Sequence, residues 1–295
     1  MASVAEPERV GFIGLGIMGK PMARRLLAAG FPLTVHTRSP GQVDELVAAG
    51  AVAADAPARV ARASDIVITM LPDTPDVEQV VLGDDGVASG VASGALVIDM
   101  STIDPGPARE IAGALHSRGV ESLDAPVSGG ERGAIDGTLS VMVGGSEQAF
   151  ARAVPILEVL GTNIVHVGPS GAGQIAKACN QLVVGATIEA VAEALVLAER
   201  SGVEPGKVRE ALLGGFAGSK ILEVHGQRML DRAFEPGFRA RLHRKDARIV
   251  LGAAEASGTP IPSFRVVAAQ LDRLVDDAGC GDLDHSALFT LLDER

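Results

Sequence analysis

One lysine of this chain lies in an apolar stretch whose spacing suits proton transfer. Lys177 and Asn180 are three residues apart in a helical pattern, and the segment from Ala178 to Ile188 carries no charge. Residues three apart share a helix face. Burial lowers the pKa of a lysine, so a buried Lys177 would donate and accept a proton near neutral pH. The alternative is a lysine whose stem packs on the surface while its amine reaches water, and the spacing alone does not separate the two.

A glycine-rich loop near the N-terminus has the pattern that binds dinucleotides. It follows the apolar run Val10–Ile13 and precedes a helical segment over Pro21–Ala29. The first glycine permits a tight turn, the second lets the backbone approach a pyrophosphate, and the third allows the helix to pack closely on the strand. Free N–H groups at the start of the helix would hold the pyrophosphate. The predicted cofactor contacts of this loop are Gly14, Leu15, Gly16, Ile17, Met18 and Gly19.

The end of the second expected strand, Leu33–Val35, indicates which dinucleotide is preferred. NAD sites usually place an Asp or Glu there to accept a hydrogen bond from the ribose 2′-OH. This chain has His36 followed by Thr37, Arg38 and Ser39, with no carboxylate. The guanidinium of Arg38 would pair instead with a 2′-phosphate, although a solvated loop arginine fits the same position. We therefore expect NADP(H) to be favoured, with NAD as the alternative.

A second loop combines a hydroxyl group with glycines. Asp124–Gly130 follows the apolar run Val120–Leu123, and in doubly wound sheets ligands bind at the carboxyl ends of strands. The hydroxyl of Ser128 and the N–H groups of Gly129 and Gly130 would bind a substrate carboxylate there. A flexible turn is the alternative.

One concentrated basic patch stands out in an acidic chain. It spans Phe238–Asp246, and Arg241 and Lys245 lie one turn apart on any helix. Charge clusters are usually solvated faces. The other interpretation is a cationic wall for an anionic substrate or cofactor.

These loops need a framework that brings them together, and the chain alternates apolar runs with helical patterns. Such alternation implies βαβ units, right-handed crossovers and a parallel sheet. The sequence therefore predicts an α/β fold, in which a Rossmann-type doubly wound parallel sheet is followed by an all-α C-terminal domain joined by a long helix. The expected strands are Val10–Ile13, Leu33–Val35, Asp65–Met70, Ala95–Asp99 and Val120–Leu123, extended by Leu139–Val143 and Asn163–Val167.

The texture of the sequence changes at Gly168–Gly171, where we expect the domain boundary. Residues 1–168 are predicted to form the NAD(P)-binding domain, and residues 169–295 an all-helical domain for substrate binding and oligomerisation. A helical pattern covers Ala172–Arg200, and its part from Ile175 to Leu197 is apolar on more than one face. Such a helix must be buried in its own domain or against a second subunit, so we expect a homodimer or homotetramer.

Composition excludes several classes of protein. The 295 residues are 47% hydrophobic but only 3% aromatic, which predicts an aliphatic core. The formal net charge of −11 would repel phosphate backbones, so we expect no nucleic-acid partner. Cys179 and Cys280 are isolated, without the Cys/His spacing of a metal site. We expect no metal and a reducing compartment.

Neither a secretion signal nor a membrane span is expected. The segment Met1–Arg9 has two glutamates and no apolar run. The most apolar region, Ile175–Ala198, is interrupted by Lys177, Glu189 and Glu193. We therefore expect a soluble, cytoplasmic protein with no membrane partner.

Taken together, these motifs resemble the β-hydroxyacid dehydrogenase family, which includes the 3-hydroxyisobutyrate dehydrogenases. The resemblance runs from about Gly11 to Leu288, nearly the whole chain. It is carried by Gly11–Met22, Asp124–Gly130, Gly137–Gly145, Gly171–Gly173 with Lys177 and Asn180, Ala217–Ser219, Pro236–Arg239, Lys245–Asp246 and Asp284–Leu288.

The resemblance implies a role for each matching residue. Lys177 would be the catalytic lysine, and Asn180 would hold the substrate beside it. Ser128, Gly129 and Gly130 would bind the substrate carboxylate. The resemblance further implies a second lysine near cofactor and substrate, an aspartate that orients it, and residues lining the nicotinamide and ribose path, which are here Lys245, Asp246, Leu71, Pro72 and Thr102. Relatives often carry Asp where Thr37 stands, which puts a preference for NAD in doubt.

The implied reaction is NAD(P)H-dependent reduction of a small anionic semialdehyde, tartronate semialdehyde, to D-glycerate, with Lys177 as general acid and base. The alternative is oxidation of 3-hydroxyisobutyrate or a related β-hydroxyacid. Imine reductases share the architecture but generally replace the catalytic lysine, so Lys177 argues against that activity. A non-catalytic dinucleotide-binding module is a further alternative.

Overall fold

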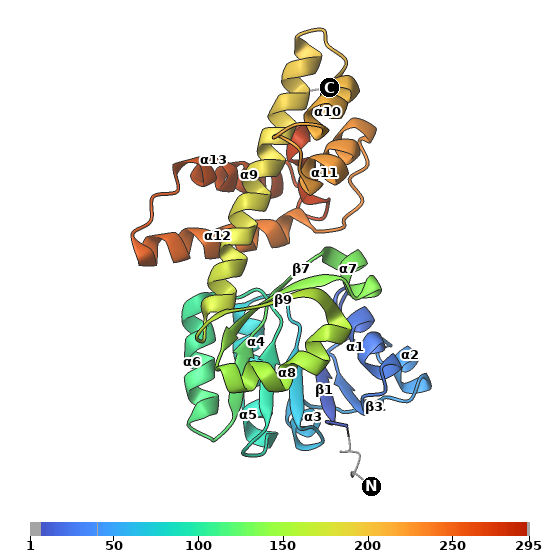
Figure 1. The fold of residues 1–295 in the computed structure, drawn as a ribbon, viewed down its shortest axis with the longest axis vertical. Coiled ribbons are helices and arrows are strands. Elements are labelled where there is room, and N and C mark those ends of the chain that lie inside the picture. Colours follow the sequence, from blue (N-terminus) through green and yellow to red (C-terminus); the bar gives the residue numbers. More distant parts are fainter. Residues whose placement is uncertain (1–6, 40, 294–295) are drawn as a thin grey trace. The chain divides into compact units, whose positions relative to one another are not determined.

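The computed structural model describes residues 7–39 and 41–293 of the chain. Of the N-terminal segment Met1–Arg9, the first six residues lie outside the described residues. The chain forms two compact units, Met1–Lys177 and Ala178–Arg295. Each unit is described separately below (Figure 1).

The first unit is built on a mainly parallel sheet whose strands follow the order β3-β2-β1-β4-β5-β6-β8-β7, with β9 paired to β8. The strands from β1 to β6 pair in parallel, whereas β8 runs antiparallel to β6 and β7. The strand order reverses beside β1, where doubly wound sheets bind their ligands. The strands are β1 (Val10–Ile13), β2 (Leu33–His36), β3 (Val52–Ala53), β4 (Ile66–Thr69), β5 (Leu96–Asp99), β6 (Glu121–Asp124), β7 (Val127–Ser128), β8 (Leu139–Gly145) and β9 (Gly161–Gly168).

Helices cover both faces of this sheet because its strands are apolar on both faces. Phe12 of β1 belongs to the core beneath α1, α2, α7 and α8, while its neighbour Ile13 belongs to the core beneath α3, α4, α5 and α6. On the first face lie α1 (Gly19–Ala28), α2 (Asp44–Ala48), α7 (Gly130–Asp136) and α8 (Glu147–Leu160). On the second lie α3 (Pro57–Arg62), α4 (Thr74–Leu82), α5 (Val87–Gly90) and α6 (Pro105–His116).

The second unit is helical in its described part. Helix α9 (Ala172–Arg200) begins in the first unit and continues into the second as one uninterrupted helix (Figure 1). Local signals set the helix ends: the Ser219 side chain accepts a hydrogen bond from the Leu222 N–H, and Gly258 closes α12 in a left-handed conformation. The other helices are α10 (Pro205–Leu213), α11 (Lys220–Asp231), α12 (Ala240–Ser257), α13 (Pro262–Asp272), η1 (Arg273–Asp277) and η2 (His285–Leu291).

The predicted strands all form, but two short strands were not predicted. β3 and β7 have two residues each, too few to show alternation. The sheet also departs from a purely parallel one, because β8 enters it antiparallel to β6. Among the described residues, α9 is the one helix long and apolar enough to cross a membrane by length and composition alone, which is weak evidence for a span; half of its most apolar window is buried inside the structure.

Candidate active site

The glycine loop has the geometry that the sequence predicts. Gly14 has a positive φ of 99°, and a Cβ there would overlap the carbonyl oxygen of Met70. A Cβ on Gly19 would overlap the carbonyl oxygen of Gly14, so the start of α1 packs directly on the loop. A Cβ on Gly16, by contrast, would meet no atom within 4 Å. The loop thus leaves open space beside its middle glycine, which fits a pyrophosphate approaching the backbone.

The start of α1 is also suited to an anion. No side chain caps this helix, and no acidic residue lies in its first turn. The dipole of a helix favours negative charge at its N-terminus. Leu15, Ile17 and Met18 complete the loop between β1 and α1, where the sequence places them.

Arg38 lies just beyond β2, but it already has a partner. Its guanidinium donates to the carboxylate of Asp76 in the first turn of α4, with Nη2 2.8 Å from Oδ1. The side chain of Arg38 is 76% exposed, so the pair is largely solvated. Thr37 and Ser39 flank Arg38. Sequence reasoning missed Asp76, because it lies 38 residues from Arg38 and only the fold brings the two together.

The loops after β4 and β5 are joined at the carboxyl edge of the sheet. The Leu71 N–H donates to Ser101 Oγ at 2.9 Å. The Ser101 N–H and the Thr69 hydroxyl both donate to Asp99 Oδ1, at 3.1 and 2.8 Å. Leu71, Pro72 and Thr102, the predicted nicotinamide and ribose contacts, belong to these two loops.

The loop after β6 requires its glycines. Ser128 ends β7 and pairs with Ser140 of β8. Gly129 and Gly130 have φ values of 138° and 61°, and the first of these is a conformation that residues with a side chain rarely adopt. The predicted carboxylate-binding group therefore lies in a turn between β7 and α7 whose backbone conformation requires glycine.

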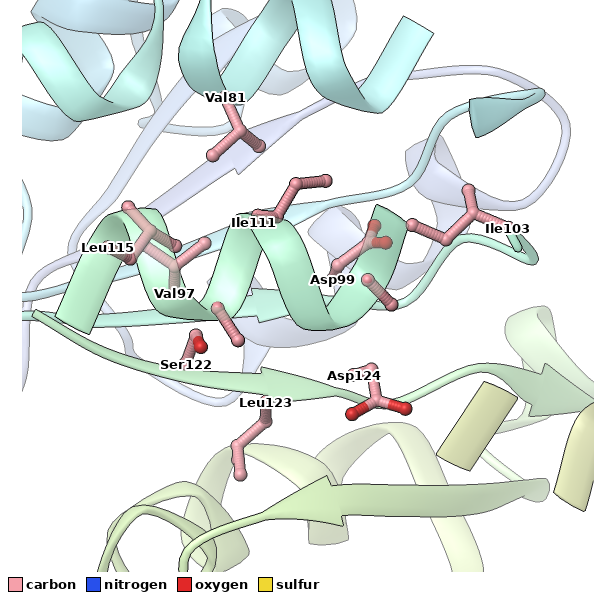
Figure 2. Close-up of a pocket in the computed structure, with 11 residues that line it drawn as sticks. Val81, Val97, Asp99, Ile103, Ile111, Leu115, Ser122, Leu123 and Asp124 are labelled. Carbon is pink, nitrogen blue, oxygen red and sulfur yellow. The ribbon is translucent and has the colours of Figure 1, made fainter. Parts of the chain in front are cut away.

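Two buried carboxylates end neighbouring strands beside this loop. Asp99 and Asp124 are register partners on β5 and β6 and line the same small pocket beneath α6 (Figure 2). Burial raises the pKa of Asp124, hydrogen bonds from the N–H groups of Gly171 and Gln174 oppose that rise, and the charge of Asp99 adds to it.

Lys177 is one of the buried charged residues of the first unit. Its exposed fraction is 6%, which disfavours a lysine with its amine in bulk water. It is the last residue of the first unit, and Ala178 is the first of the second. Asn180 is half-buried on the same helix, three residues further on.

Three predicted residues of the second unit are connected through a glutamine that the sequence did not single out. The Asn180 side-chain amide donates to Gln181 Oε1 at 2.8 Å, and Gln181 donates in turn to Asp246. Lys245 Nζ lies 2.8 Å from Asp246 Oδ1. Gln181 was missed because a glutamine on a helix usually faces water, and here it is 4% exposed.

The rest of the basic patch is neutralised by aspartates. Arg239 and Arg241 both pair with Asp282, and Arg244 pairs with Asp276. The side chains of Arg239, Arg241 and Arg244 are 42%, 49% and 22% exposed. This part of the patch therefore fits a paired and mostly solvated surface better than a cationic wall.

One group of described residues has the proximity of metal ligands: His225, Asp284 and His285. The oxygens of Asp284 are already occupied, however. Oδ2 accepts from the N–H groups of Gly237 and Phe238 and lies 3.1 Å from the guanidinium of Arg228, and Oδ1 accepts from the N–H and hydroxyl of Ser286. A cation would displace these bonds, so we interpret the group as structural.

Two family models match the chain. The model described as the NAD binding domain of 6-phosphogluconate dehydrogenase matches residues 9–168. The model described as NAD-binding of NADP-dependent 3-hydroxyisobutyrate dehydrogenase matches residues 171–292. Both concern nicotinamide dinucleotides.

Similar proteins cover the chain almost end to end. The 2-hydroxy-3-oxopropionate reductase of Escherichia coli (strain K12) is 47% identical over 285 residues, which are 97% of each chain. The NAD-dependent L-serine dehydrogenase of Pseudomonas aeruginosa is 41% identical over 97% of this chain and 98% of its own. A solved structure of Mycobacterium tuberculosis 3-hydroxyisobutyrate dehydrogenase with L-serine has a TM-score of 0.89 and 34% identity, covering 97% of this chain and 99% of the other.

Proposed function

Because this chain belongs to the β-hydroxyacid dehydrogenases of the 3-hydroxyisobutyrate dehydrogenase type, we propose that it reduces tartronate semialdehyde (2-hydroxy-3-oxopropionate) to D-glycerate. The chain is an NAD(P)-dependent oxidoreductase. The observation that carries the proposal of substrate is the 47% identity with the Escherichia coli reductase over 97% of both chains. The buried position of Lys177 supports the proposed chemistry.

Lys177 is the proposed general acid. When bound, the dinucleotide supplies the hydride that reduces the substrate carbonyl. Negative charge then develops on the carbonyl oxygen, where the ammonium of Lys177 stabilises it and delivers a proton. Burial strengthens this interaction because little water screens it.

The remaining residues bind and orient. The Ser128 hydroxyl and the N–H groups of Gly129 and Gly130 hold the substrate carboxylate, and Asn180 holds the substrate near Lys177. Asp246 fixes the amine of Lys245, at 2.8 Å, in one direction. Leu71, Pro72 and Thr102 line the nicotinamide and ribose path, and the pyrophosphate lies on the loop from Gly14 to Gly19.

NADPH is the proposed cofactor, with NADH as the alternative. The support is the absence of a carboxylate at Thr37, Arg38 and Ser39 and the single exposed guanidinium there. Asp76 weakens this preference, because it holds the same guanidinium and would repel a 2′-phosphate.

We further propose a cytoplasmic homodimer or homotetramer. Helix α9 leaves apolar side chains at the surface of the single chain, with Val183 59% and Leu197 68% exposed. A second subunit would cover them. Light scattering that reports a monomer across micromolar concentrations would contradict this.

An alternative substrate is 3-hydroxyisobutyrate or another β-hydroxyacid, oxidised by the same residues. The L-serine dehydrogenase among the relatives favours this alternative, because L-serine also carries a hydroxyl on its β-carbon. A dinucleotide-binding module without catalysis predicts no turnover with any of these compounds. A panel of substrates, run in both directions, separates the three.

The test is the initial rate of NADPH and NADH oxidation with tartronate semialdehyde, for the natural protein and for Lys177→Ala. We expect turnover with NADPH preferred, and a loss in kcat of about 10²- to 10⁴-fold in the variant, because a positioned proton donor contributes that much. Dinucleotide affinity stays nearly unchanged. Lys207→Ala is the control, since Lys207 is 74% exposed in a surface pair with Glu210. If Lys177→Ala retains most of its activity, the role of Lys177 is refuted.

A further inference from the structure

The first turn of α9 is fastened to the sheet by a carboxylate that the proposed chemistry does not use. Asp124, the last residue of β6, accepts from the Gly171 N–H through Oδ1 at 2.7 Å and from the Gln174 N–H through Oδ2 at 2.9 Å. Free N–H groups at a helix start need such acceptors, and a negative charge there also suits the helix dipole. Asp124 therefore fixes where α9 begins.

Gln174 connects this same turn to the loop after β5. Its Oε1 accepts from the Ile103 N–H at 3.1 Å, and its Nε2 donates to the Ser101 carbonyl oxygen at 2.9 Å. These two backbone groups stand on either side of Thr102, and the side chain of Gln174 is fully buried. Only a side chain with one acceptor and one donor at this reach satisfies both groups.

The first turn of α9 is in close backbone contact with the sheet. A Cβ on Gly173 would overlap the carbonyl oxygens of Asp124 and Met142, and a Cβ on Gly144 would lie 2.7 Å from the Gly173 nitrogen. Backbone thus packs against backbone where the first turn of α9 meets β8. In so close a contact the turn behaves as one rigid piece, so any shift that follows a change in its hydrogen bonds is shared by the whole turn.

We propose that Gln174 and Asp124 are positioning residues. They fix the position of Lys177 along the axis of α9, relative to the loop that carries Thr102. The inference rests on the proposed catalytic role of Lys177. Lys177 lies three residues beyond Gln174, a rise of about 4.5 Å along a rigid helix, so a displaced first turn displaces the amine. Misplacement of a reacting group by about 1 Å can cost about 10²-fold in rate. Except for Thr102, the groups proposed to bind the substrate and the dinucleotide lie outside the loop that Gln174 holds, so these affinities change far less than kcat.

The experiment compares Gln174→Met, Gln174→Glu and Ser64→Ala with the natural protein. Methionine keeps the length of the side chain and removes both hydrogen bonds, while glutamate keeps the acceptor for Ile103 and loses the donor to Ser101. Ser64 is the matched control: it is 4% exposed in the same unit, and its hydroxyl donates to the Val60 carbonyl oxygen at 2.8 Å, away from α9.

For both Gln174 variants we expect kcat with tartronate semialdehyde to fall about 10- to 100-fold, with KM and the Kd for NADPH within threefold. The deuterium isotope effect on kcat, measured with NADPH deuterated at the transferred position, should rise, because hydride transfer becomes slower relative to product release. Ser64→Ala should lower Tm and leave kcat and the isotope effect unchanged.

Two results overturn the proposal. One is a natural kcat and isotope effect in Gln174→Met. The other is a loss of activity in Gln174→Met that only follows the folded fraction, with kcat per folded molecule unchanged. Lys177→Ala, assayed alongside, separates the two claims: if it loses activity while Gln174→Met does not, only the positioning role is wrong. If it keeps activity, the proposed role of Lys177 fails and the positioning role fails with it.

Discussion

Each unit of this protein contains a buried polar network, and the two networks connect different kinds of segment. In the first, Asp99, Ser101, Asp124 and Gln174 form what we call the strand-end network, which binds the loops after β4 and β5 to the start of α9. In the second, His225, His243, Asp284 and His285 form what we call the histidine network.

The histidine network holds its own unit together. Asp284 ties the turn at Gly237 and Phe238 to the start of η2 at Ser286. Burial alone would raise the pKa of Asp284, but its interactions with His225, His285 and Ser286 outweigh burial, and the pKa lies well below its usual range. The comparison teaches that a buried polar network does not by itself mark an active site. Its role depends on which segments of the chain its hydrogen bonds connect.

The largest expected effect in the histidine network is that of Asp284→Ala. Removal of the carboxylate leaves several buried donors unpaired and the guanidinium of Arg228 without its partner. We expect a loss of about 3–5 kcal/mol in the free energy of unfolding, measured by urea titration, with the Kd of the folded protein for NADPH unchanged. Asp282→Ala, which removes exposed ion pairs with Arg239 and Arg241, should cost about 1 kcal/mol or less. Equal losses in the two variants would mean that Asp284 has no special structural role.

A buried acid in the second unit gives an effect of intermediate size that depends on pH. Burial, with repulsion from Glu193, raises the pKa of Glu189 from 4.5 to about 7, opposed by Gln270 and Arg273. The protonated form is therefore favoured in the folded chain, and stability falls as pH rises from about 4.5 through 7. Glu189→Gln should be more stable than the natural protein at pH 8, by up to about 3 kcal/mol, and equal to it at pH 4.5. Urea midpoints at both pH values test this, and a gain that is the same at both would contradict it.

Asp76→Asn gives the smallest expected effect and returns to the first unit. It frees Arg38 and removes a negative charge beside the proposed 2′-phosphate position. Exposed pairs contribute about 0.2–1 kcal/mol, so we expect NADPH to bind about two- to fivefold more tightly and NADH to bind as before. Fluorescence titration with each cofactor measures the two affinities. Equal changes in the two affinities would show that neither Arg38 nor Asp76 determines the preference between NADPH and NADH.

The sequence predicted the parts of the site that depend on local chemistry. Gly14 and Gly19 follow from the strand and helix around them, and their geometry agrees. The family resemblance read from the motifs is confirmed by the family models and relatives. The individual roles of Lys177, Ser128 and Asn180 stay predictions.

The parts that sequence reasoning missed depend on contacts far along the chain. Gln174 bonds to Ser101 and Ile103, which lie 73 and 71 residues away. A single glutamine in an apolar helix does not reveal such partners. Likewise, β8 runs antiparallel to both β6 and β7 because the chain reverses its direction after β7, across α7, and no local sequence pattern shows that reversal.

The order of the three histidines has a consequence for where their hydrogens lie. His285 Nδ1 faces His243 Nδ1 at 2.9 Å, and His285 Nε2 faces His225 Nε2 at 3.3 Å. Burial holds the pKa of His285 well below its usual value, which favours a neutral ring with one hydrogen. It must therefore donate to one neighbour and accept from the other.

If the hydrogen of His225 lies on Nδ1, 3.5 Å from Asp284 Oδ1, its Nε2 offers only a lone pair to His285. If that hydrogen lies on Nε2, it points at His285, and the tautomers of His285 and His243 must then both reverse. The position of one hydrogen on a half-buried ring therefore fixes the tautomers of two rings in the core. Nitrogen-15 chemical shifts of the imidazoles would show the three rings changing together.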